Sequence, residues 1–185
     1  MTVAHRKSRV GFVIIKLRVA EAIFYLMRVN SKWKDVNFIG GHDKRRDAGD
    51  LKNTARRELW EEVPSLRGYP RLDLEPLTGV VRYGPMLSRS KGDQVEYDIQ
   101  FFLLRITRSP STLIELLSAR TRNVWVSEDE LIHPTRYRLS NLVKLLDQVT
   151  PGGIRTIPFS SAIDMSSWRN YFEPQDDEQL KFALK

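Results

Sequence analysis

The sequence predicts one helix that carries acidic side chains along one face. Apolar residues recur at every fourth position and form one stripe, made of Leu51, Ala55, Leu59 and Val63. This period predicts a helix over residues 51–63 that packs the stripe against a core. Carboxylates at positions i, i+3 and i+4 lie beside the stripe: Glu58, Glu61 and Glu62. Their mutual repulsion costs a few tenths of a kcal/mol per pair, and a hard divalent cation such as Mg²⁺ would offset it. The alternative is a solvated helix face on which Arg57 and Glu61 form an i,i+4 ion pair.

A strand followed by a Gly-Gly turn precedes this helix, at Phe38-Ile39-Gly40-Gly41-His42. Together with the block Arg57-Glu58-Leu59-Trp60-Glu61-Glu62, it resembles the signature of the Nudix hydrolases. The resemblance implies an α+β fold, an α/β/α sandwich around a mixed β-sheet, with a Nudix-like domain over residues 1–150. Beyond Gly153 the resemblance fades, so we expect residues 151–185 to form an extension packed on the same domain or on a partner chain.

The resemblance also implies the chemistry: Mg²⁺-dependent hydrolysis of a diphosphate linkage in a nucleoside diphosphate joined to another moiety. By this comparison Mg²⁺ or Mn²⁺ is held by Glu58, Glu61, Glu62 and the carbonyl of Gly41. The implied catalytic residues are Glu58, Glu61 and Arg57. Glu58 or a nearby acid would take the proton from water, and Arg57 would orient a glutamate through a bidentate pair.

The loop between the turn and the helix departs from the family pattern. It is two residues longer, and the loop glutamate of the signature is missing, with Asp47 or Asp50 as its substitute. Pro64 stands where the signature has its final glycine, although a proline also ends a helix. Asp50 is a good N-cap. The loop side chains that could contact a phosphate chain are His42, Lys44, Arg45 and Arg46, and the alternative is that they are solvated surface charges.

The remaining pattern predicts a β-rich domain. Strands are expected over residues 9–17, 22–29, 77–83, 97–106 and 123–126, and residues 68–76 are expected to be irregular. Ser127 and Glu130 have the spacing of a capping box, and residues 139–149 have helical periodicity. A further acid from outside the central helix is also expected to serve the site, and its candidates are Glu96, Asp98 and Glu115.

Composition limits the partners. The chain has 185 residues, no cysteine and a net charge of +7. The absence of cysteine excludes thiolate zinc sites and fits a reducing, cytoplasmic location. The positive charge favours polyanions: we expect a nucleotide-type substrate and keep RNA open. The apolar run at residues 10–15 is too short for a membrane span, so no membrane partner is expected. A homodimer is left open.

Two alternatives to the hydrolase remain. The first is a catalytically weakened Nudix-fold module that binds nucleotides or regulates, which the altered loop favours. The second is a member that removes a pyrophosphate or cap from RNA 5′ ends, which the net charge of +7 permits although the basic residues are dispersed.

Overall fold

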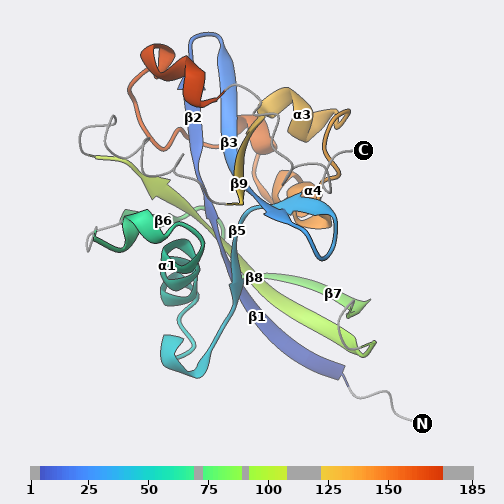
Figure 1. Cartoon of the computed structure of the whole chain (residues 1–185). Helices are drawn as coiled ribbons and strands as arrows, with labels where there is room; N and C mark the ends of the chain where they lie inside the picture. Colours follow the sequence, from blue (N-terminus) through green and yellow to red (C-terminus); the bar gives the residue numbers. More distant parts are fainter. Residues whose placement is uncertain (1–4, 69–72, 89–91, 108–121, 173–185) are drawn as a thin grey trace.

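The fold is seen in a computed structural model that describes residues 5–68, 73–88, 92–107 and 122–172 (Figure 1). A mixed sheet contains five strands, with β1 (His5–Ile14) at its centre. β1 pairs in parallel with β8 (Gln94–Arg105) and antiparallel with β5 (Ile39–His42). The other edge of β8 pairs with two strands, β6 (Asp73–Pro76) and β7 (Val81–Leu87), both antiparallel.

The second sheet is antiparallel. It is built from β2 (Lys16–Val19), β3 (Ala22–Asn30), β4 (Asp35–Asn37) and β9 (Asn123–Ser127). β3 lies between β2 and β9 and also pairs with β4. The chain passes from β1 into β2 with only Ile15 between them, so one nearly continuous strand joins the two sheets (Figure 1).

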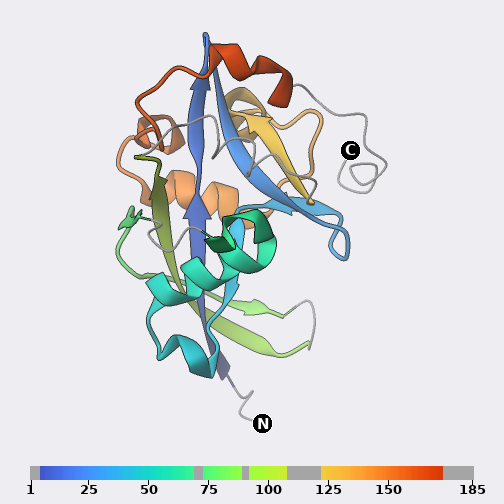
Figure 2. The ribbon, with the colours of Figure 1, turned by 60° about the vertical axis from the view of Figure 1, so that its left-hand side comes forward.

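Two apolar clusters hold these layers together. α1 (Leu51–Glu62) crosses one face of the mixed sheet (Figure 2), and its Leu51, Ala55 and Leu59 pack with Val13 of β1. The opposite face of β1 packs against β3 and α4 (Asn141–Val149). Side chains of a strand alternate between its two faces. β1 therefore serves both clusters.

Short elements complete the fold. They are the 3₁₀ turns η1 (Arg45–Asp47), η2 (Pro64–Gly68), η3 (Ile154–Thr156) and η4 (Ser166–Tyr171), and the short helix α3 (Glu128–Ile132). Met165 and Phe172 are buried in the cluster beneath α1, so residues 151–172 pack on the same body. The boundary at residue 150 stays a prediction. No helix in the described part of the chain is long and apolar enough to span a membrane.

The predicted mixed α+β fold is confirmed, and α1 ends one residue before the predicted end. The expected irregular stretch over residues 68–76 is wrong in part, because residues 64–68 and 73–76 form η2 and β6. Only Leu74 of β6 is buried, so this edge strand has almost no apolar alternation to reveal it. The predicted capping box is half correct. Ser127 accepts a hydrogen bond from the amide of Glu130 at 3.3 Å, but the Glu130 carboxylate binds the Thr135–Tyr137 loop instead.

Candidate active site at Gly40 and Gly41

A strip of glycine backbone brings α1 close to the sheet. Gly11 of β1 pairs directly with Gly41 of β5. A Cβ at Gly11 would lie 2.5 Å from the carbonyl oxygen of Leu51, and a Cβ at Gly41 would lie 2.6 Å from the carboxylate of Glu58. Only glycine permits both approaches. The strip therefore fixes how near the acidic face of α1 lies to Gly40 and Gly41. The predicted Gly-Gly turn is wrong, because both glycines lie within β5 and pair with Phe12 and Gly11 of β1.

The loop before α1 is organised around a buried arginine. Asp50 is the N-cap, as predicted, and accepts a hydrogen bond from the amide of Lys52 at 2.8 Å. Arg57 donates from Nε and Nη2 to Asp47 at 2.9 Å each. Hydrogen bonds from Arg57 hold the pKa of Asp47 at about 2, well below its usual range. Asp47 thus binds the signature arginine as an anion and fixes the lengthened loop to α1.

Glu62 lies against the glycines of β5. Its carboxylate accepts a hydrogen bond from the amide of Gly40 at 3.1 Å and pairs with Nε of Arg28 at 3.2 Å. Burial raises the pKa of Glu62 to about 7, with further upward shifts from Glu58 and Glu61. Residual like-charge repulsion therefore remains in this cluster, as its spacing along the helix predicted.

Glu61 is held by cations from the loop. Its carboxylate pairs with Lys44 at 3.2 Å, with Arg46, and with Nη1 of Arg57 at 3.2 Å. Although burial opposes the change, these contacts with Lys44 and Arg57 lower the pKa of Glu61. Glu58 pairs with the same Nη1 of Arg57. Each acid of the cluster thus already has a cationic partner.

No three acidic or histidine side chains converge tightly enough to hold a metal ion among the described residues. The donor set has the chemistry that a hard divalent cation prefers, although each of its carboxylates pairs with an arginine or a lysine in this structure. It offers carboxylate oxygens from Glu58, Glu61 and Glu62 at one end of α1, and the close approach of Gly41 leaves no side chain between this backbone and Glu58. A cation bound there would compete with Lys44 and Arg46 for Glu61.

A cavity of about 360 Å³ opens on the face of β5 away from α1. Its walls combine aromatic rings with short polar side chains. They include Gly40, Gly41, His42, Trp33, Tyr83, Tyr97, Asn37, Ser140 and Asn141. The Ser140 hydroxyl lies 2.9 Å from Oδ1 of Asn37. Gly40 and Gly41 of β5 therefore border both the acidic cluster and this cavity.

The structure places the predicted residues in two groups. Gly41, Arg57, Glu58, Glu61 and Glu62 lie together with Lys44 and Arg46, whereas the His42 side chain belongs to the cavity and its Nδ1 lies 2.8 Å from Ser8. Arg45 is exposed and does not line the cavity. Glu96 and Asp98 face Lys7 and Arg82 at 4.0 and 3.9 Å, and Glu115 lies outside the described residues.

Several site residues were missed in the sequence. Arg28 is the clearest case: a lone cation in an otherwise apolar strand was a signal that a buried acid faces it. The cavity residues gave no such signal, because they come from six strands (β1, β3, β4, β5, β7 and β8), from α4 and from the loops beside them.

The fold and this cluster define a class of protein in which an acid-rich helix is packed on a glycine-containing edge strand of a mixed sheet. The chain belongs to the NUDIX domain family, because the family model of the NUDIX domain matches residues 7–146. A search of curated proteins finds no matching sequence.

Solved structures give distant matches. NrtR from Shewanella oneidensis has a TM-score of 0.54 at 13% identity, and the match covers 77% of this chain and 61% of that one. NrtR complexed with a 27mer DNA gives a TM-score of 0.51 at 15% identity, covering 76% and 59% of the two chains. The chain thus spans about three fifths of the NrtR length. These likenesses show the fold alone. A mutT/nudix family protein from Listeria innocua matches at a TM-score of 0.39 and 15% identity, covering 61% and 71%, which is too low to carry an argument.

Proposed function

We propose that the chain is a hydrolase that uses Mg²⁺ or Mn²⁺ to cleave a diphosphate linkage in a nucleoside diphosphate joined to another group. Its membership of the NUDIX family supports hydrolysis of phosphoanhydrides in general. The observation that carries the proposal is the position of Gly40 and Gly41 in β5, which contact the carboxylates of Glu58 and Glu62 on one side and line the cavity on the other.

In this proposal, the carboxylates of Glu58, Glu61 and Glu62 and the carbonyl of Gly41 hold the cation. The bound cation would supply charge neutralisation at the phosphate and a lowered pKa for the attacking water. Glu58 would accept the proton of that water. Arg57 would position Glu58 and Glu61 through its Nη1, while its other nitrogens remain on Asp47.

The cavity would hold the nucleoside part of the substrate. Trp33, Tyr83 and Tyr97 offer ring faces for a base, and Asn37 and Asn141 offer hydrogen-bonding groups. A phosphate chain that extends from the cavity past Gly40 and Gly41 of β5 would then reach the acids of α1. His42 would be the residue of the predicted phosphate-binding set that meets the substrate first, since Lys44 and Arg46 are engaged with Glu61.

The test is release of a nucleoside monophosphate from a panel of dinucleotides and nucleoside diphosphate sugars, with and without Mg²⁺. We expect Glu61→Gln to lower turnover by about 10²-fold or more, because it removes a charge that acts on the reacting groups. Glu75→Gln is the matched control, since Glu75 is exposed on β6 and pairs with Arg105. Near-wild-type turnover by the Glu61 variant at saturating Mg²⁺ would overturn the assignment.

The second candidate is a Nudix-fold module that binds a nucleotide or nucleic acid without hydrolysis. The three cations on Glu61 favour it, because they neutralise an acid that catalysis would need. The DNA in one NrtR structure and the net charge of +7 make nucleic acid, including RNA 5′ ends, the natural ligand to try. No monophosphate release from any substrate, together with steeply salt-dependent binding of DNA or RNA, would establish this candidate instead.

A further inference from the structure

A second, larger cavity of about 770 Å³ lies at the other end of the antiparallel sheet. Its lining comes from the β2–β3 hairpin, β9, α3 and η4. The pairing of β3 with β9 sets its position relative to the acidic cluster. Asn123 pairs with Arg28 at the Glu62 end, and Ser127 pairs with Phe24 at the cavity. Four residues of strand separate these ends, which is roughly 13 Å. The two places are therefore distinct.

Aromatic rings form one wall of this cavity. Trp125 and Phe172 lie with ring centroids 4.5 Å apart at an interplanar angle of 46°, and Phe24 and Phe172 lie 5.3 Å apart at 44°. Phe172 is buried, whereas Phe24 and Trp125 keep part of their surface open. These tilted contacts fix the rings through packing. A planar ligand would meet a rigid apolar surface here without ordering new side chains.

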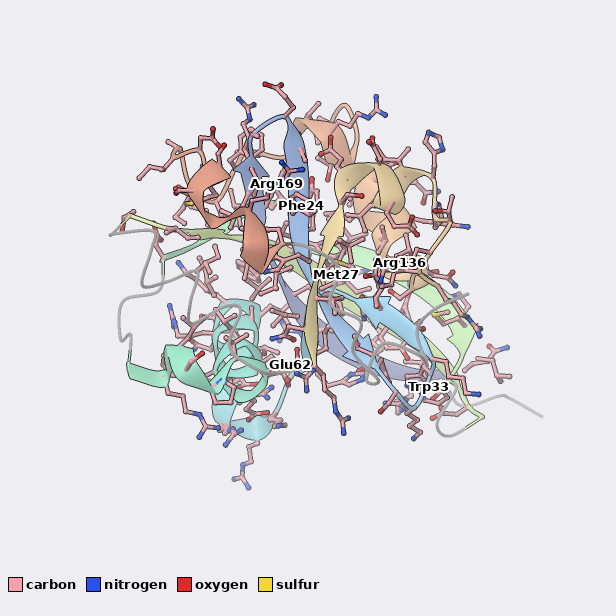
Figure 3. All side chains as sticks on the ribbon, turned by 45° about the horizontal axis from the view of Figure 1, so that its top comes forward. Phe24, Met27, Trp33, Glu62, Arg136 and Arg169 are labelled. Atoms are coloured by element: carbon pink, nitrogen blue, oxygen red, sulfur yellow. The ribbon has the colours of Figure 1, made fainter. Side chains whose placement is uncertain are left out.

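Two arginines complete the lining, Arg169 from η4 and Arg136 from the segment after α3 (Figure 3). Within the described residues, neither guanidinium has an ion pair with a carboxylate. Arg136 lies over the ring of Tyr137, with 5.4 Å from its Cζ to the ring centroid. Two guanidinium groups at one cavity offer forked donors of the kind that bind phosphate in a bidentate manner.

The acids of the same cavity do not neutralise these arginines by contact. Glu130 directs its carboxylate to the loop, where it accepts from the amides of Thr135, Arg136 and Tyr137 at 2.6–2.8 Å. It also accepts from the Thr135 hydroxyl at 2.8 Å. Glu21 is exposed at the β2–β3 turn. Among the residues that the structure describes, the acids of the cavity thus leave the donors of both arginines to a ligand.

We propose that this cavity is a second binding site, for an aromatic anion of the nucleoside monophosphate class. The ring of such a ligand would pack on Phe24 and Trp125, and its phosphate would bind Arg136 and Arg169. Its volume lies within the roughly 300–1,000 Å³ of small-molecule sites, and stacking of one base on an aromatic side chain contributes about 1–3 kcal/mol. Binding at this second site does not require hydrolysis at Gly40 and Gly41.

The test counts bound adenosine 5′-monophosphate by titration calorimetry in the full chain. The variant Arg136→Ala/Arg169→Ala is expected to lose one equivalent relative to the wild type, since each lost contact with a charged group weakens binding about tenfold or more. Arg138→Ala is the matched control, because Arg138 is an exposed neighbour that does not line the cavity. It should bind as the wild type does.

The reference is the wild-type count. A fall from two equivalents to one shows that this cavity binds the monophosphate in addition to the proposed active site. A fall from one to none shows that this cavity binds it even if the site at Gly40 and Gly41 binds no nucleotide. Equal counts in the wild type and a double-arginine variant with unchanged melting temperature overturn the proposal. If the alanine variant does not fold, Arg136→Lys/Arg169→Lys replaces it, and the expected result is binding at least tenfold weaker at one site; unchanged affinity would be equally decisive against it. Adenosine and inorganic phosphate alone should each bind more weakly than the monophosphate, because each lacks one of the two groups that the cavity accepts.

Discussion

The glycine strip beneath α1 makes a prediction about stability that is independent of any activity. In Gly11→Ala, the new Cβ would lie 2.5 Å from the carbonyl oxygen of Leu51 and 3.0 Å from the amide of Ala55. Both are backbone atoms of α1, so no side-chain rotation relieves the contact. The helix must move away from β1, which disturbs the packing of Leu51 and Ala55 in the core.

Overpacking of this kind costs about 1–3 kcal/mol. For a domain of this size, about 1 kcal/mol corresponds to a change of about 2–4 °C in melting temperature. We therefore expect Gly11→Ala to lower Tm by roughly 2–12 °C and to lower the urea midpoint at unchanged slope. Both are measured by circular dichroism.

Gly79→Ala is the matched control. A Cβ at Gly79 would have no atom within 4 Å, and the residue has no positive φ, so its stability should change by no more than about 0.5 kcal/mol. The same melting temperature for the Gly11 and Gly79 variants would refute the claim that α1 rests directly on the glycine strip.

Four further predictions follow from contacts at and around the site. Gly41→Ala should lower kcat/KM by about 10²-fold while changing Tm less than Gly11→Ala does, because its Cβ displaces the mobile end of Glu58 rather than backbone; a large Tm loss with full activity would contradict this. Lys44→Ala/Arg46→Ala should tighten Mn²⁺ binding about 2–30-fold in calorimetry, since each of the two exposed pairs to Glu61 is worth about 0.2–1 kcal/mol. Weaker binding would count against competition between these two cations and the metal for Glu61. Asp47 has a folded pKa of about 2, below its ordinary value, so its ionised form stabilises the fold by about 2 kcal/mol above pH 4 and loses that contribution as the pH falls towards 2. The denaturant midpoints of the wild type and Asp47→Asn should therefore converge on acidification. A difference between the two midpoints that does not change with pH would disprove the linkage. Lys16→Met should lower the free energy of unfolding by about 3 kcal/mol, because it leaves Glu128 without its buried partner at 2.9 Å. The double variant Lys16→Met/Glu128→Gln should recover part of that loss in urea titrations. Additive losses from the two substitutions would show that the pair is not coupled.

The central helix could be predicted from the sequence because its signals are local. The four-residue period, the Asp50 cap and Pro64 all act within α1 or at its ends, and the helix runs from Leu51 to Glu62. The two glycines were predicted to form a turn, whereas they lie within β5 and form part of the surface on which the helix rests. That role depends on Gly11, which is 30 positions away and pairs with Gly41 only through the register of β1 and β5.

The partners of the acids could not be predicted for the same reason. Arg28 reaches Glu62 from another sheet, and Asp47 reaches Arg57 from the lengthened loop. A helix pattern gives the direction of a carboxylate but not the cation that meets it. The second cavity is the extreme case, since Phe24, Trp125, Arg136 and Arg169 are spread over some 145 positions of the chain.

The parallel pairing of β1 with β8 has a consequence for the order of folding during synthesis. β1 is made first, but its parallel partner begins 80 residues after β1 ends, at Gln94. The antiparallel pair of β1 and β5 and the β2–β3 hairpin can form earlier, since their strands are near one another in sequence. Contacts between distant segments slow folding because the loop between them must first close. On the ribosome, β5 and α1 would therefore pack on an incomplete sheet. The edge of β1 that pairs with β8 would stay unpaired until residues 94–105 have emerged.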